Sequence, residues 1–283
     1  MYPQKLLIPI YKNVLKASQG RGAHTLAKLD AFIFRNKREV FIDEAQNISL
    51  LLPANPHFLG FVLRSHEQHI TNMMRTLLKE GDTVIDVGAN IGYFSAWAAV
   101  FIGKSGRIFA LEPEGDNLNI LTENIESLKK KGFDCYGFGL AASNSNGTAV
   151  LRLHRHSTYH SIEDEHHVLD KVEATQIIDT IKLSDWAVDN KVEYISLLKI
   201  DTEGHEIQVL EGAESLYEAR RVSHTILECR SQHIYQYIGI FCKKFNLTLS
   251  IWDGHQWHSE SLDEVEPKLE CLISNKLEYN KLN

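Results

Sequence analysis

Hydrophobic positions follow two different periods along this chain of 283 residues. From residue 83 onward, short apolar runs typical of strands buried on both faces of a sheet alternate with segments whose apolar residues lie three and four positions apart, as in amphipathic helices. Strands that alternate with helices predict a doubly wound, mostly parallel sheet, so the expected fold class is α/β and Rossmann-like. The sheet is expected to have seven strands, at residues 83–87, 107–111, 136–140, 195–200, 225–227, 247–252 and 269–273.

The first 66 residues show no repeating strand–helix unit. Their pattern predicts short elements, with helices at 12–16 and 23–34 and strands at 40–42 and 48–52. We therefore expect an N-terminal α+β extension over residues 1–66 and a main domain over residues 67–283. Three roles stay open for the extension, which could cover a binding site, form a homodimer contact or only pack against the main domain.

Charge and cysteine content narrow the classes of function. The chain has 30 Lys and Arg against 37 Asp and Glu, a formal net charge of −7. Because tight binding to a phosphate backbone depends on clustered Lys and Arg, we expect no nucleic-acid partner. The four cysteines form no Cys-x-x-Cys pair, and we interpret them as buried thiols of a reducing compartment. No segment approaches the roughly 20 apolar residues of a membrane span, and the expected location is the cytoplasm.

The loop after the first strand of the main domain is the first candidate for a binding site. In doubly wound sheets, ligands bind beyond the C-terminal ends of the strands, where the strand order reverses. Here the loop reads Asp-Val-Gly-Ala-Asn-Ile-Gly over residues 86–92, and glycine lets a ligand approach the backbone closely. A dinucleotide fingerprint needs three glycines, but its positions hold Gly88, Asn90 and Tyr93. This loop also lacks the Gly-Lys-Ser/Thr sequence of a phosphate-binding loop.

The second strand ends in Glu112, an acid placed to accept hydrogen bonds from two ribose hydroxyls. An acid at this place, beside a loop that lacks the dinucleotide glycines, indicates a nucleoside ligand without pyrophosphate, and S-adenosylmethionine (SAM) is such a ligand. The alternative is a structural turn followed by a chance Glu. After the third strand, Ala142 is expected beside the adenine, because small residues leave room for a flat base.

These residues resemble the FkbM family of SAM-dependent methyltransferases from about residue 67 to residue 275. The resemblance rests on five stretches, at 81–95, 110–113, 121–124, 199–206 and 226–228. It implies a class I methyltransferase fold and transfer of a methyl group to a hydroxyl oxygen of a sugar, glycolipid or natural product. The cofactor-binding residues are then expected to be Glu67, Asp86, Gly88, Ala89, Asn90, Gly92, Glu112 and Ala142.

The roles of Glu67, Asp201 and His205 stay open. Glu67 lies where the family also tends to have Glu, which implies a contact with the methionine end of SAM, and an exposed helical Glu is the alternative. His205 stands where the family usually has Ala. A general base typically contributes about 10²–10⁴-fold to the rate of such a transfer. Asp201 ends the fourth strand and is expected to position the acceptor or act as the base, and His205 is the alternative base, because the reference pKa of imidazole is about 6.5.

Two other groups of polar residues, the acids near the ends of two strands and a histidine-rich segment, are not expected to bind a metal. Asp201 and Glu228 could converge and hold Mg²⁺ through oxygen ligands, but we favour no metal. Glu203 and Glu206 are interpreted as favourable charges at a helix N-terminus. A histidine-rich segment lacks any zinc-like spacing and is interpreted as a solvated loop near the acceptor; it holds His154, His156, His160, His166 and His167.

Three alternatives to the O-methyltransferase hypothesis remain. The chain could be a non-catalytic SAM-fold protein used for binding or assembly, or it could methylate a nitrogen on a different acceptor. An NAD-dependent oxidoreductase is disfavoured by the missing glycines. The expected partner is a small hydroxyl-bearing acceptor.

Overall fold

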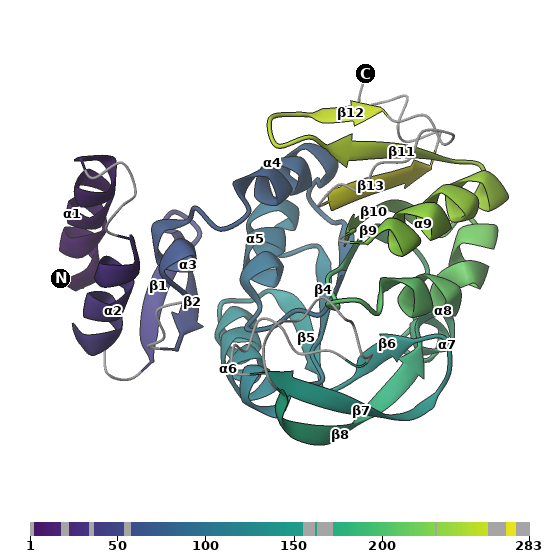
Figure 1. Cartoon of the computed structure of the whole chain (residues 1–283), viewed down its shortest axis with the longest axis horizontal. Helices are drawn as coiled ribbons and strands as arrows, with labels where there is room; N and C mark the ends of the chain where they lie inside the picture. Colours follow the sequence, from purple (N-terminus) through teal and green to yellow (C-terminus); the bar gives the residue numbers. More distant parts are fainter. Residues whose placement is uncertain are drawn as a thin grey trace.

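A computed structural model describes residues 3–17, 23–33, 37–53, 58–154, 162, 172–229, 231–259 and 270–275. Its centre is an eight-stranded sheet (Figure 1) with the strand order β12-β11-β13-β10-β9-β3-β4-β5. Five strands run parallel: β5 (Asp134–Phe138), β4 (Arg107–Leu111), β3 (Thr83–Val87), β9 (Ile195–Ile200) and β10 (Val222–Glu228). The strand order reverses at β3, so the predicted doubly wound α/β fold is confirmed.

The other strands of this sheet are antiparallel: β13 (Glu270–Asn275), β11 (Leu247–Trp252) and β12 (Trp257–Ser259). The first two are the predicted final strands. The three-residue β12 adds an eighth strand at the edge, where Trp257 pairs with Trp252 across the turn that contains Gly254.

Alternation along the buried strands divides the interior into two cores. Val84 and Ile108 face one core, which is covered by the helices α4 (Gln68–Leu77), α5 (Tyr93–Ile102) and α6 (Gly115–Lys130). Ile85 and Phe109 face the other core, which is covered by α7 (Leu183–Asp189), α8 (Glu206–Glu218) and α9 (Gln232–Phe245). Because successive side chains of a strand point to opposite faces, one apolar strand serves both layers.

The N-terminal elements lie beside α5 and α6, away from α8 and α9 (Figure 1): α1 (Pro3–Ala17), α2 (Ala23–Ile33), β1 (Arg38–Asp43), β2 (Ile48–Leu52) and α3 (Leu59–Leu63). Asn124 of α6 holds the hairpin in place. Its Oδ1 accepts from the Leu51 N–H at 2.6 Å, and its Nδ2 donates to the carbonyls of Leu51 at 3.1 Å and Ile91 at 2.8 Å. One amide thus joins the extension to the loop that follows β3.

A second sheet of three strands lies below the main sheet in Figure 1. It consists of β6 (Ala141–Ser143), β8 (Val172–Lys182) and β7 (Gly147–His154), and β7 is the strand expected after the turn at 143–147. The long strand β8 begins inside the segment that the sequence suggests is a loop. Most of the histidine-rich segment, including His156, His160, His166 and His167, lies outside the described residues.

Several boundaries differ from the predicted ones for local reasons. Helix α6 is capped by Glu114 rather than Asp116, because the Glu114 carboxylate accepts from the N–H groups of Asp116 and Asn117. Strand β5 begins two residues earlier than expected. Helix α1 passes through Pro9 and is much longer than the predicted segment 12–16, and α3 has too few residues to show a helical period.

The cysteines and the helices agree with the remaining expectations about the chain. All four cysteines are free and buried, as the sequence indicates: Cys135, Cys229, Cys242 and Cys271. Among the described residues, we find no helix with the length and apolar content that a bilayer crossing requires.

Close packing of α8 on β6 gives a test of this arrangement. A Cβ added at Gly212 would lie 1.9 Å from the carbonyl oxygen of Ser143, so Gly212→Ala forces the two elements apart. We expect a loss of about 1–3 kcal/mol in the free energy of unfolding, measured by urea denaturation. Gly115→Ala is the matched control, because its Cβ would meet only Gln176 at 3.7 Å; it should be neutral or stabilising by up to about 1 kcal/mol. Equal stability of both variants would contradict the packing.

Candidate functional site

A cavity of about 330 Å³ opens at the C-terminal ends of β3, β4 and β9. This is the place where the strand order reverses and where doubly wound sheets bind ligands. Its lining comes from the loops that follow these strands, from β6 and from the segment that precedes α4. The lining residues discussed below are Phe61, His66, Glu67, Gly88, Ala89, Asn90, Tyr93, Phe94, Glu112, Ala142, Lys199, Asp201, Glu203 and His205.

Gly88 is required by the close approach of two loops. Its φ of +73° is rarely adopted by other residues, and an added Cβ would lie 1.8 Å from the carbonyl oxygen of Asp201. The Asp201 N–H donates to the Val87 carbonyl at 3.0 Å, while the N–H groups of Gly88 and Ala89 both donate to the Leu111 carbonyl. The loops after β3, β4 and β9 are therefore held together by backbone contacts.

Glu112 is buried at the end of β4, where both carboxylate oxygens accept backbone hydrogen bonds. Oε2 accepts from the Asn90 N–H at 2.8 Å, and Oε1 accepts from the Glu114 N–H at 2.9 Å. Burial raises the pKa of Glu112 to about 7, although the two hydrogen bonds oppose this shift. Each carboxylate oxygen keeps a second lone pair, so this carboxylate can still accept hydrogen bonds from a ligand in the cavity.

His205 and Ala142 meet on the same side of the cavity. Ala142 lies in β6, a separate short strand, and its neighbour Ser143 is buried. The Nε2 of His205 lies 3.0 Å from the Ser143 Oγ, and the imidazole is buried. The sequence suggests that His205 could face solvent at a helix start. The structure instead ties its ring to the strand that carries Ala142.

Lys199 is a buried cation beneath the cavity. It lies opposite Asp86 in the pairing of β3 with β9, and its Nζ is 3.9 Å from Asp86 Oδ1, 3.0 Å from Asp201 Oδ2 and 4.5 Å from the ring centre of Phe94. Burial alone would lower the pKa of Lys199, but the carboxylates of Asp201 and Asp86 raise it. The lysine stays charged and holds the Asp201 carboxylate in place.

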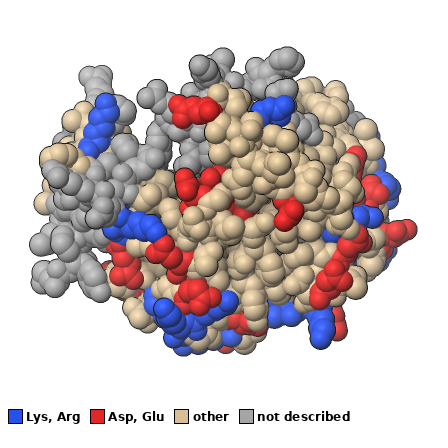
Figure 2. Space-filling model, turned by 90° about the horizontal axis from the view of Figure 1, so that it is seen from below, with Lys and Arg blue, Asp and Glu red and all other residues tan. Residues whose placement is uncertain are grey.

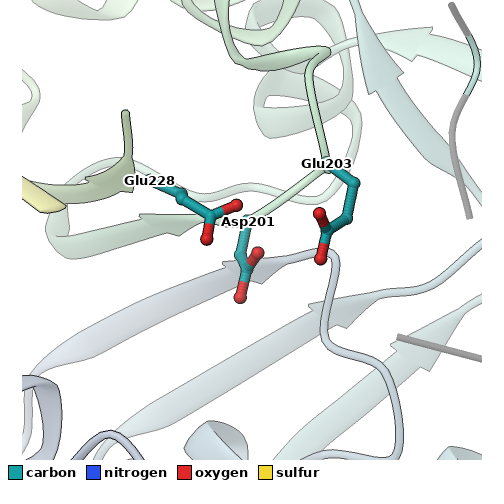
Figure 3. A group of neighbouring side chains, drawn as sticks. All are labelled: Asp201, Glu203 and Glu228. Carbon is teal, nitrogen blue, oxygen red and sulfur yellow. The ribbon is translucent and has the colours of Figure 1, made fainter. Parts of the chain in front are cut away.

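Three carboxylates gather where β9 and β10 end (Figure 3). One oxygen each of Asp201, Glu203 and Glu228 lies within 4.8 Å of the others. The predicted approach of Asp201 to Glu228 is therefore confirmed, and Glu203 joins them. Glu206 does not: it is buried and accepts from the N–H groups of Thr202 and Gly204, which closes the loop before α8.

The wall opposite β9 comes from the segment around α3 and from α5. The rings of Phe61 and His66 stack with their centres 4.1 Å apart, and Tyr93 contacts both rings edge-on. Burial lowers the pKa of His66 to about 4, so its ring is neutral near pH 7. Next to it, Glu67 faces the cavity with 31% of its side chain exposed.

Two expected cofactor-binding residues do not line the cavity. Asp86 is fully buried, where its Oδ2 accepts from the Ser95 Oγ at 2.7 Å. Gly92 begins α5 with a φ of +86°, and its free space is limited by Leu121. Both residues shape the loop from within. The other expected site residues all line the cavity.

Sequence reasoning missed the roles of Lys199, Phe61 and His66. A lysine within the apolar strand Ile195–Ile200 was a usable signal, because a buried lysine needs a charged partner. Phe61 and His66 carried no such signal, since nothing in their local pattern relates them to the distant loops.

Comparison with known proteins identifies a matching family and several relatives. The domain described as "Methyltransferase FkbM domain" matches residues 86–260, more than half of the chain. The chain is 26% identical over 168 residues to the hexuronic acid methyltransferase AglP of Haloferax volcanii, covering 57% of this chain and 62% of that relative. It is 33% identical over 49 residues to a probable cobalt-precorrin-6B C(15)-methyltransferase of Saccharolobus solfataricus, covering 17% of this chain and 25% of the relative. The chain thus spans less than two thirds of each of these relatives.

One similar solved structure is the following. The FkbM methyltransferase of Methylobacillus flagellatus is 15% identical to this chain, with a TM-score of 0.46 over 92% of this chain and 60% of the other. On the match over residues 86–260, the chain belongs to the FkbM family of methyltransferases.

Proposed function

We propose that this protein transfers the methyl group of SAM to a hydroxyl oxygen of a small, sugar-like acceptor. The observation that carries the proposal is the buried Glu112 carboxylate at the end of β4, beside the loop of residues 88–90, which lines the same cavity. Membership of the FkbM family agrees with it. A sugar acceptor is supported by the relative AglP, whose name specifies hexuronic acid.

The residues present fit SAM. Glu112 would accept hydrogen bonds from the ribose hydroxyls, and the loop Gly88–Asn90 would hold the methionine end above the start of α5, where a helix N-terminus favours a carboxylate. Ala142 leaves space for the adenine, and His205, pinned by Ser143, lies beside it. This position makes His205 a poorer candidate for the base than the sequence suggests.

When bound, SAM supplies a methyl group on a good leaving group, so the protein needs to align the acceptor oxygen and remove its proton. Asp201 is our choice for aligning the acceptor. Its carboxylate is held by Lys199 and faces the cavity, and a fixed hydrogen-bond acceptor can orient a hydroxyl. Glu67, Asp201, Glu203 and Glu228 surround this side, which favours an uncharged hydroxyl group over an acidic sugar.

The surface charge of one face bears on the kind of partner that could bind there. On the face shown in Figure 2, Lys and Arg lie mainly toward the edges, and the middle is largely uncharged with scattered Asp and Glu. That face offers little to a polyanion, because clustered positive charge is what attracts one. A small neutral acceptor agrees better with it.

The proposal is tested by calorimetry followed by an acceptor screen. SAM and its product S-adenosylhomocysteine (SAH) should bind, and NAD should not. Labelled SAM should then transfer its methyl group to hydroxyls in a panel of neutral methyl glycosides and lipid extracts. Binding without transfer to any acceptor would favour a non-catalytic SAM-fold protein, and transfer to amines alone would favour N-methylation.

The ribose contact can be tested with Glu112→Ala. Loss of a charged acceptor for two hydroxyls should weaken SAM binding by about 1.5–3 kcal/mol per hydrogen bond, measured by calorimetry. Glu126→Ala is the control, because Glu126 is exposed on α6, where it forms an ion pair with Lys129. Unchanged SAM affinity in Glu112→Ala would remove Glu112 from the cofactor site.

The alignment role of Asp201 predicts a separable defect. Asp201→Asn should keep SAM affinity and reduce kcat/KM by about 10²-fold or more on a methyl glycoside that the wild type accepts. Treatment with a chelator should leave wild-type turnover unchanged. Inactivation by the chelator with rescue by Mg²⁺ would instead assign Asp201, Glu203 and Glu228 to a metal ion, and full activity of Asp201→Asn would exclude this residue from the mechanism.

A further inference from the structure

Glu67 occupies an unusual position at the start of α4. Its backbone is left-handed, with φ 39° and ψ 54°, a conformation that costs energy for a residue other than glycine. Although it stands at the N-cap, its side chain makes no capping hydrogen bond. The strained backbone instead directs the carboxylate to the cavity wall that Glu67 shares with Asp201 and Lys199.

The Glu67 carboxylate differs from the other acids of the cavity in having little to hold it. Its Oε1 is 3.8 Å from the Nε2 of His66, beyond hydrogen-bond distance, and the His66 ring is neutral near pH 7. By contrast, both oxygens of Glu112 accept from backbone N–H groups, and Asp201 accepts from Lys199. Glu67 thus lacks the hydrogen bonds that hold Glu112 and Asp201, and its carboxylate is open to a new proton.

The charges around Glu67 come from four elements. Burial, the Asp201 carboxylate and Glu270 of β13 raise the pKa of Glu67, whereas Lys199 of β9 and His69 of α4 lower it, and the net result is a pKa of about 7. Tyr93 of α5 also faces it, since Glu67 is one of the groups that raise the pKa of that phenol. A base whose pKa lies near the working pH is the most effective in proton transfer.

We propose that Glu67 takes the proton of the acceptor hydroxyl, while Asp201 only aligns that hydroxyl; this inference rests on the proposed function. In the step, the acceptor oxygen forms a bond to the methyl carbon, and the carbon–sulfur bond breaks with its electron pair remaining on sulfur. The hydroxyl proton moves to the Glu67 carboxylate. Atoms and charge balance, because the positive charge of the sulfonium becomes the proton on Glu67.

Glu67 and the sulfonium charge are then coupled. A cation bound in the same cavity lowers the pKa of a nearby carboxyl, so Glu67 is ionised and able to accept a proton before transfer. After transfer the sulfur is neutral, the pKa of Glu67 rises again, and the carboxyl keeps the proton. SAH, which carries no sulfonium charge, should therefore leave Glu67 as it is in the free protein.

Calorimetry of SAM and SAH in buffers of different ionisation enthalpy measures this coupling without an acceptor. At pH 7, where a group with a pKa of about 7 is half protonated, SAM should release up to about half a proton more than SAH. Glu67→Gln should bind both molecules within about threefold of wild type and abolish the difference. Proton release caused by contacts with the ribose or the methionine end cancels, because both molecules carry these groups, whereas a response of Glu112 to the sulfonium charge would persist in Glu67→Gln.

Other outcomes would overturn the inference. SAM and SAH could release equal numbers of protons on binding, and Glu67→Gln could abolish the release for both. That result would mean that Glu67 contacts the methionine amino group, which both molecules carry. A difference that persists in Glu67→Gln would assign the coupling to another residue. Absence of SAM binding to the wild type would instead refute the proposed function itself.

Turnover gives the second measurement. On a neutral methyl glycoside that the wild type methylates, Glu67→Gln should lose about 10²–10⁴-fold in kcat at saturating SAM, while Glu67→Asp should recover part of it and keep the pH dependence. Thermal unfolding shows whether the variants are folded. Wild-type kcat in a folded Glu67→Gln variant would exclude Glu67 as the proton acceptor.

Discussion

The positive charge of Lys199 constrains the centre of this molecule. An ammonium group that is removed from water needs nearby negative charge, and loss of one partner of a buried pair typically costs about 3–5 kcal/mol. Asp86 supplies part of that charge from the neighbouring strand, and Asp201 supplies the rest from the end of the same strand. The pair Asp86–Lys199 lies in register between β3 and β9, where the strand order reverses. Lys199 thereby links the buried Asp86 to Asp201, which lines the cavity.

Much of this arrangement follows from the sequence because it depends on local periodicity. The buried strands are visible as apolar runs, and parallel strands bring their C-terminal ends to one edge, so the amino-acid pattern alone predicts the approach of Asp201 to Glu228. Prediction failed where contacts are long-range. Ala142 was placed correctly at the cavity, but no local signal showed that it belongs to β6.

The positions of Phe61 and His66 in the cavity wall also could not be predicted from the local sequence. Phe61 and His66 precede residue 86, where the match to the FkbM domain begins, and they reach the cavity because α3 and the following turn lie against α5. Asn124 fixes the nearby hairpin to the Ile91 carbonyl, so the extension and the loop after β3 are held as one unit. The residues matched by the FkbM domain supply the loops on one side of the cavity, and a separate segment supplies the aromatic wall. That wall could therefore change, and with it the accepted substrate, while the loops proposed to bind the cofactor stay the same. The last part of the extension therefore contributes Phe61 and His66 to the lining of the cavity.

Three carboxylates around one cavity differ in what holds them, and that difference gives each a separate chemistry. Glu112 is fixed by two backbone N–H groups, so it can recognise hydroxyls but has few free lone pairs for anything else. Asp201 is fixed by its hydrogen bond to Lys199, which suits it to orienting a hydroxyl group. Glu67 has neither constraint, and its burial beside other acids makes the neutral form accessible near pH 7. Methyl transfer removes the positive charge from sulfur and leaves one proton on the protein. It therefore needs a carboxylate such as Glu67, which is able to take up that proton. The strained backbone at Glu67 is then the local cost of presenting that carboxylate to the cavity.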